Sequence, residues 1–121
     1  MSCNNSTADF RPAKYNIQIW RNDSWTQIFA LLANEVPIDL SGSIIEIQVR
    51  TTPTATNAEL TLTLGNGLTI GGVDNNQVII NSIVDISAGN YVYDLTVVFP
   101  SEIVKTYVWG TFIVFEDITK I

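Results

Sequence analysis

The sequence contains no histidine and only one cysteine among its 121 residues. Without histidine the chain lacks the side chain that most often serves as a general base near neutral pH. It can form no serine–histidine pair, no histidine metal ligand and no imidazole pH switch. The single cysteine, Cys3, excludes a disulfide within the chain. We interpret Cys3 as an unpaired thiol, with a bridge to another chain or a metal contact as the alternatives.

Basic residues are also scarce. Six lysines and arginines stand against twelve aspartates and glutamates, so the formal net charge is −6. This balance argues against a nucleic-acid partner, which would require a basic surface. Residues 1–9 lack the charged and apolar segments of a secretion signal, and no apolar run approaches the roughly 20 residues of a membrane span. We therefore expect synthesis and folding in a cytoplasm without export, and no membrane contact.

β-Branched residues, by contrast, are abundant. The chain has 16 isoleucines, 11 valines and 13 threonines, a third of its residues, and hydrophobic residues make up 46%. Such side chains are stiff about χ1 and favour pleated strands, and this apolar content excludes a disordered chain. The length predicts one domain with one core.

Alternation of apolar and polar residues predicts most of the strands. The expected strands cover residues 15–20, 45–50, 60–64, 68–70, 77–80, 90–99, 103–109 and 111–118. The last two are expected to pair with each other across Gly110. Residues 25–32 fit a helix and a strand equally well, and residues 83–87 predict a connecting turn or a single helical turn.

The expected fold is all-β. Eight or nine strands with turn residues about every ten positions indicate an antiparallel sandwich or barrel rather than alternating strands and helices. We predict an antiparallel β-sandwich of the immunoglobulin-like kind. Residues 1–12 show no periodicity and are expected to form a flexible arm, and residues 13–121 a single β-sandwich domain.

A short motif supports the immunoglobulin-like form of the sandwich. Asp85, Gly89 and Tyr91 have the acid–glycine–tyrosine spacing that opens the sixth strand of such domains. In that corner the glycine permits the turn and the tyrosine hydroxyl bonds back to upstream backbone. Tyr93 stands where disulfide-bearing domains have a cysteine, so we expect an aromatic ring to fill the core there.

No pattern in the sequence assembles a catalytic or metal site. The glycine-rich segment 65–72 lacks the lysine of a phosphate-binding loop. Residues 74–76 offer oxygens to calcium but no further ligand completes a cage. Glu116 and Asp117 are adjacent, so on a strand they face opposite sides. We expect no enzyme activity, no metal and no cofactor.

Three tryptophans are the remaining candidates for a binding role. Trp20, Trp25 and Trp109 are expected to pack the ends of the sandwich or an interface, because tryptophan is seldom left on bare surface. The alternative is that they stack on sugars as part of a glycan-binding module.

Several segments together resemble a known family. They are Trp25-Thr26-Gln27, Val36-Pro37-Ile38-Asp39-Leu40-Ser41-Gly42, Ile47-Gln48-Val49-Arg50, Asn66-Gly67-Leu68-Thr69-Ile70, Gly89-x-Tyr91-x-Tyr93-Asp94-Leu95 and Gly110-Thr111-Phe112-x-Val114. In these segments the chain resembles the small immunoglobulin-like modules of tailed bacteriophages, found in baseplate and fibre-anchoring proteins and in head-fibre or capsid decoration proteins. The resemblance covers residues 14–118.

The resemblance implies that residues 25–32 form a strand and that the protein is a non-enzymatic component of the virion. Related modules often form the base of a longer fibre, whereas this sequence stops at Ile121. We therefore expect a capsid decoration or head-fibre component that contacts other virion proteins. A tail or baseplate adaptor that anchors a receptor-binding fibre is the alternative. Monomer, dimer and trimer are all compatible with the sequence.

Overall fold

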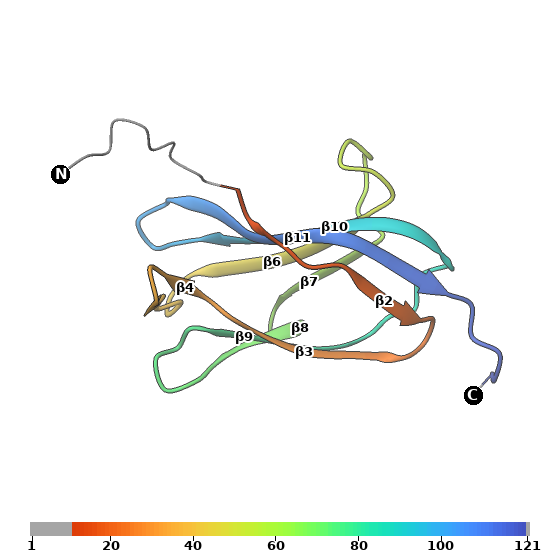
Figure 1. The fold of residues 1–121 in the computed structure, drawn as a ribbon, viewed down its shortest axis with the longest axis horizontal. Coiled ribbons are helices and arrows are strands. Elements are labelled where there is room, and N and C mark those ends of the chain that lie inside the picture. Colours follow the sequence, from red (N-terminus) through yellow and green to blue (C-terminus); the bar gives the residue numbers. More distant parts are fainter. Residues whose placement is uncertain (1–10, 121) are drawn as a thin grey trace.

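The computed structural model describes residues 11–120, and these form strands and no helix (Figure 1). The all-β prediction is confirmed, and no helix able to cross a membrane is found in this range. The strands are β1 (Ala13–Lys14), β2 (Ile17–Trp20), β3 (Ser24–Ala30), β4 (Leu32–Ala33), β5 (Val36–Pro37), β6 (Ile44–Arg50), β7 (Leu60–Leu64), β8 (Gly67–Gly71), β9 (Gln77–Ile83), β10 (Gly89–Val98) and β11 (Val104–Phe115). Cys3 and most of the expected arm lie outside the described residues.

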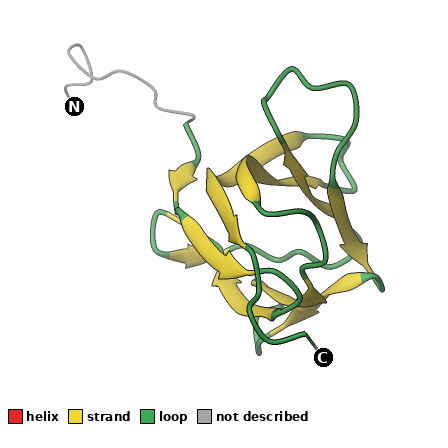
Figure 2. Ribbon diagram, turned by 90° about the vertical axis from the view of Figure 1, so that its right-hand side faces the viewer, coloured by secondary structure: helices red, strands yellow, loops and turns green. Residues whose placement is uncertain are grey.

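Nine of these strands form one curled sheet with the order β1-β11-β10-β6-β7-β8-β9-β3, and β2 also pairs with β11. The sheet folds back on itself, so that β11, β10 and β6 lie above β3, β8 and β9 in Figure 1, and the end-on view shows a partly closed barrel (Figure 2). We call these two halves the upper and lower layers. Strands β4 and β5 form a separate small ribbon.

The sheet is mixed, so the expectation of a purely antiparallel fold is wrong. β1 and β2 run parallel to β11, and β7 runs parallel to β8. β2 lies along β11 at one edge of the sheet, and after the turn at residues 21–23 the chain enters β3 at the other edge.

The hairpin predicted across Gly110 is also wrong. Residues 104–115 form one continuous strand, and its hairpin partner is β10, which it follows after the turn at residues 99–103. Gly110 lies in the middle of β11, where a Cβ atom would come within 2.2 Å of the carbonyl oxygen of Tyr15. The glycine permits the close approach of the first strands and makes no turn.

Most of the ambiguous segment 25–32 is strand, as the family resemblance implied; residues 25–30 belong to β3, and Leu32 begins β4 after a break at Leu31. In β3 the side chain of Trp25 is buried while that of Ile28 is exposed, which is the alternation of a strand with one face in the core. The connection after β9 contains no helical turn; it places Val84 and Ile86 in the core.

The core fills the space between the two layers. Inward-facing side chains alternate with outward-facing ones along the long strands. The buried residues of the upper layer include Ile45, Ile47, Val49, Tyr91, Tyr93, Leu95, Val97, Val108, Phe112 and Val114. Those of the lower layer include Trp25, Leu68, Val78 and Ile80. Both layers therefore depend on one shared core.

Replacing Gly110 with alanine tests the close approach. The added methyl group would overlap the backbone of Tyr15, so Gly110→Ala should lower the free energy of unfolding by about 1–3 kcal/mol in urea denaturation. Gly89→Ala is the matched control. A Cβ there would lie 3.6 Å from the Tyr91 ring, an ordinary contact, and stability should hardly change. Equal stability of the two variants would contradict the close approach.

Candidate functional site

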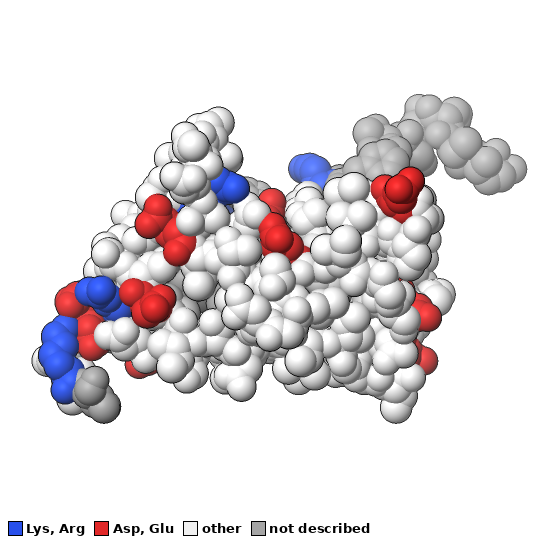
Figure 3. Space-filling view, turned by 180° about the vertical axis from the view of Figure 1, so that it is seen from behind, with Lys and Arg blue, Asp and Glu red and all other residues white. Residues whose placement is uncertain are grey.

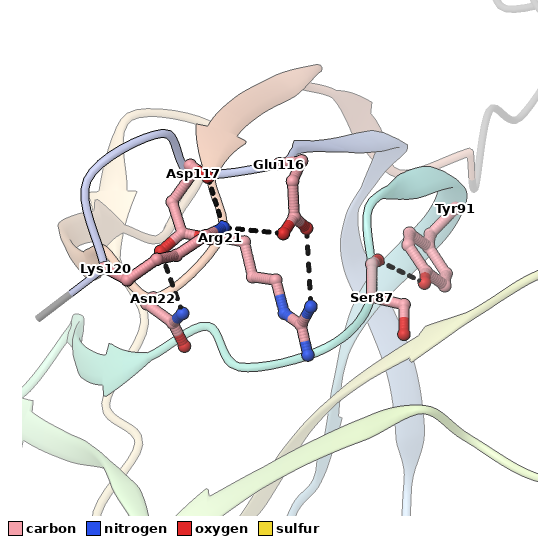
Figure 4. Close-up of polar contacts among 7 residues, drawn as sticks. All are labelled: Arg21, Asn22, Ser87, Tyr91, Glu116, Asp117 and Lys120. Carbon is pink, nitrogen blue, oxygen red and sulfur yellow. Dashed lines mark hydrogen bonds and ion pairs between the residues drawn. The ribbon is translucent and has the colours of Figure 1, made fainter.

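Tyr91 forms the corner that the sequence suggested. Its hydroxyl donates a hydrogen bond of 2.6 Å to the carbonyl oxygen of Ser87 (Figure 4). The ring is buried at the start of β10, and this burial raises the pKa of the hydroxyl. Gly89, however, has no positive φ and has room for a side chain, so the turn does not require glycine there. The corner is a structural element, held mainly by the tyrosine.

Trp25 belongs to the core and not to a binding surface. Its ring makes edge contacts with Tyr93, at 5.9 Å between centroids, and with Phe112, at 5.0 Å. Tyr93 and Phe112 also contact each other, and the Tyr93 hydroxyl donates to the carbonyl oxygen of Tyr15 at 2.5 Å. Burial raises the pKa of Tyr93 well above its usual range. We call Trp25, Tyr93 and Phe112 the aromatic cluster.

The other two tryptophans are on the outside. Trp20 is 46% exposed at the end of β2, and its ring lies 5.8 Å from that of Phe115 on the adjacent strand. Trp109 is 40% exposed on the outer face of β11, with the ammonium group of Lys14 at 5.2 Å from the ring centroid. The structure thus does not bring the three tryptophans together.

Trp109 lies beside a groove on the outer face of the upper layer. The groove has a volume of about 300 Å³. Its wall includes Gln48, Arg50, Val92, Asp94 and Trp109. On the sequence alone, Gln48 and Arg50 are only two polar residues of the expected strand 45–50. Their proximity to Asp94 and Trp109 depends on the pairing register of β6, β10 and β11, which alternation alone does not reveal.

A cluster of polar side chains connects the β2–β3 turn with the residues that follow β11 (Figure 4). Lys120 lies 2.8 Å from a carboxylate oxygen of Glu116 and of Asp117. Arg21 also pairs with Glu116, and Asn22 donates to Asp117. β11 ends at Phe115, so the two carboxylates lie beyond the strand and converge on Lys120, contrary to the opposite faces expected for them.

The described residues hold no group of three or more Cys, Asp or Glu side chains placed to bind a metal. The amide groups of Asn75 and Asn76 form hydrogen bonds to Ser41 and to the backbone of Leu31. Gly65, Gly67 and Gly72 have positive φ values, as expected for turn glycines. The glycine-rich segment 65–72 and the segment 74–76 therefore order the loops around β8.

The lower layer has an unpaired edge. Within residues 11–120, β3 pairs with β9 on one side and with no strand on the other. The outward-facing side chains of β3 and β9 are all uncharged. They are Ser24, Thr26, Ile28, Ala30, Gln77, Ile79, Asn81 and Ile83. Seen from behind, the molecule also has a broad uncharged area, with charged groups above it and near the ends (Figure 3).

The corner hydrogen bond can be tested by removing only the hydroxyl. Tyr91→Phe should lower the free energy of unfolding by about 1 kcal/mol, the usual net value of one hydrogen bond. Tyr91→Ala should lower it by about 3–5 kcal/mol, because it also empties the ring's space. Urea denaturation measures both changes. Tyr15→Phe is the control, since that ring is half exposed; an unchanged Tyr91→Phe protein would contradict the corner.

The cluster around Lys120 predicts a change in titration. Hydrogen bonds from Lys120 lower the pKa of Glu116 and of Asp117. Lys120→Ala should therefore raise the pKa of both carboxyls toward their ordinary values, as measured by NMR titration. In the native protein the stabilisation from this cluster is complete above the ordinary carboxyl pKa, and it is lost as the pH falls through the lowered values. Lys105→Ala is the control and should leave both groups unchanged.

The chain matches no protein-family model, and no curated protein matches its sequence. Its function is therefore inferred from its own residues and their geometry.

Proposed function

We propose that the protein is an immunoglobulin-like module of a tailed-bacteriophage virion, attached to the capsid as a decoration or head-fibre component through protein–protein contacts. The strand order supports the immunoglobulin-like form. In such domains the second, fourth and fifth strands share one sheet, and the third, sixth and seventh share the other. β3, β9 and β8 correspond to the first set, and β6, β10 and β11 to the second. β7 occupies the position of the extra strand beside the third strand.

The aromatic cluster supports the same assignment. In disulfide-bearing immunoglobulin domains, a bond between the second and sixth strands joins the two sheets, and its second cysteine follows the corner tyrosine by two residues. Tyr93 follows Tyr91 at that spacing, and its ring contacts Trp25 on β3. An aromatic contact thus takes the place of the covalent link, as suits a chain with no disulfide partner.

The observation that carries the functional proposal is the unpaired edge of β3. Leu31 donates its N–H to Asn76, which places Leu31 opposite Asn76 in the ladder. Hydrogen bonds alternate along an antiparallel pair, so Phe29 and Gln27 also bond toward β9. Thr26 and Ile28 then point their backbone groups toward the unpaired side. These groups can bond to a strand from another protein.

The composition of this edge suits docking. Protein edges are commonly protected from pairing by lysine, proline or a bulge. β3 has the sequence Ser-Trp-Thr-Gln-Ile-Phe-Ala, which contains none of these residues and no charge, and its pairing with β9 continues without a register shift. We infer that an extended segment of a neighbouring virion protein adds to β3. The alternative is that the protein is a tail or baseplate adaptor; the same edge of β3 would then pair with a tail or fibre protein.

The proposal is tested on particles made from the genome that encodes this chain. Mass spectrometry of purified particles should detect the protein, and cryo-electron microscopy should show its density on the head shell. Density on the tail would replace the decoration role with the adaptor role. Particles that lack the protein would refute a role in the virion.

A proline tests the edge itself. Thr26→Pro removes an N–H that points away from β9, so the sheet should keep its hydrogen bonds while an added strand loses one. Incorporation into particles should fall about tenfold or more. Thr26→Ala, which keeps the N–H, is the matched control and should be incorporated normally. Thermal unfolding checks that the proline variant folds, and Ile28→Pro is the second variant. Full incorporation of both folded proline variants would contradict docking on β3.

A further inference from the structure

The groove beside Trp109 lies on the face of the upper layer that points away from the core. Its residues come from β6, β10 and β11 and from the loop after β6, which contributes Pro53. The inward side chains of these strands belong to the core, whereas Gln48, Asp94 and Trp109 alternate with them and point outward. Tyr93, a core residue, also contributes to the lining of the groove, which is separate from the β3 edge.

One row across the sheet contains three residues of the groove and the neighbouring Lys14. Lys14 pairs with Trp109, Trp109 with Asp94, and Asp94 with Gln48. Directly opposed residues on neighbouring strands lie about 5 Å apart at their Cβ atoms, so adjacent members of the row can contact the same small molecule. The row thus places an aromatic ring between a cation on one side and hydrogen-bonding groups on the other.

A ligand in the groove can contact the ring of Trp109. Trp109 is 40% exposed, and Lys14, whose ammonium lies 5.2 Å from the ring centroid, does not line the groove. The cation–π contact favours a fixed position of the ring. A ring held in this way offers a flat apolar surface at the edge of a polar cavity.

The polar groups are also held in place. Arg50 donates to the side-chain oxygen of Gln48 through Nε and Nη2, at 3.1 and 2.6 Å, and to the carbonyl oxygen of Ala55 through Nη1 at 2.8 Å. The amide nitrogen of Gln48 donates in turn to Glu46. A guanidinium group has five N–H donors, so Arg50 has donors left for a ligand. The network fixes their direction before a ligand arrives.

Asp94 supplies an acceptor that the protein itself does not use. Within the described residues its carboxylate forms no hydrogen bond. Partial desolvation raises the pKa of Asp94, while the charge of Arg50 acts in the opposite direction. Asp94 is exposed on the outer face of β10, so its carboxylate is open to a ligand that brings hydroxyl groups.

We propose that this groove binds a neutral saccharide, with Trp109 as the stacking surface and Asp94 and Arg50 as acceptor and donor for its hydroxyl groups. A pyranose ring has an apolar C–H face that matches an indole and a rim of hydroxyls that both donate and accept. Asp94 in the groove wall disfavours an anionic ligand, and the fixed polar network disfavours a purely apolar one. A volume of about 300 Å³ fits one or two sugar units.

The test uses the full chain and an array of neutral mono- and oligosaccharides built from glucose, galactose, mannose and N-acetylglucosamine. At least one of these sugars should bind and should shift the indole NMR signal of Trp109. Trp109→Ala and Asp94→Asn should each weaken that binding by roughly tenfold, while urea denaturation shows both variants folded. Trp20→Ala is the matched control, because Trp20 packs against Phe115 outside the row, and it should bind normally.

Three outcomes would overturn the assignment. One is that no sugar on the array binds at millimolar concentration. Another is that the folded Trp109→Ala and Asp94→Asn variants bind like the native protein. The third is that Trp20→Ala weakens binding as much as Trp109→Ala, which would move the site to the Trp20–Phe115 pair. None of these results depends on the particle experiments, so the groove and the β3 edge are tested separately.

Discussion

The contact between Trp25 and the rings of Tyr93 and Phe112 is the interaction on which the two layers depend. Trp25 comes from the lower layer and its two partners from the upper layer, so the cluster joins strands that are far apart in the order of the sheet. Within the described residues, the continuous backbone pairing of the layers runs through β7 and β8, which share only two register positions. The core around the aromatic cluster therefore holds the layers together, since this short ladder contributes little. A chain without a disulfide needs large rings at this point, because each buries a large area and fixes its neighbours by edge contacts.

The same cluster determines the path of the first strands. The Tyr93 hydroxyl bonds to the backbone of Tyr15, and Gly110 leaves space for that backbone to approach β11. The chain then passes along β11 as β2, turns at residues 21–23 and enters the lower layer with Trp25. Arg21 and Asn22 connect this turn to Glu116 and Asp117 after β11. Position 110 is thus a glycine for a reason of packing, although on sequence alone it is indistinguishable from a turn glycine.

The sequence predicted local features well and long-range ones poorly. Alternation located β6 and β10, because period-two patterning records which side of a strand is in the core. It left residues 25–32 undecided between helix and strand, and only the family resemblance favoured the strand that β3 forms. The Tyr91 corner was recognisable because its hydrogen bond spans only four residues. The parallel pairing of β2 with β11, the continuity of β11 and the row from Lys14 to Gln48 were not recognisable. The pairing and the row depend on register between distant strands, which alternation in one sequence does not reveal. The continuity of β11 depends on the close approach of the Tyr15 backbone to Gly110, which is equally invisible in the sequence.

The proposed attachment and the proposed sugar binding are compatible in one small module because they would use opposite layers. The β3 edge belongs to the lower layer, and the groove of Trp109 and Asp94 opens on the outer face of the upper layer, with the core between them. A strand added to β3 would extend the lower layer sideways and would leave β6, β10 and β11 exposed to solvent. The distribution of charge fits this division. The β3 edge is uncharged, as a backbone-mediated contact requires, whereas the groove carries the ionised groups that a sugar's hydroxyls can satisfy. A protein fixed to a particle by one layer would therefore present its ligand site on the other.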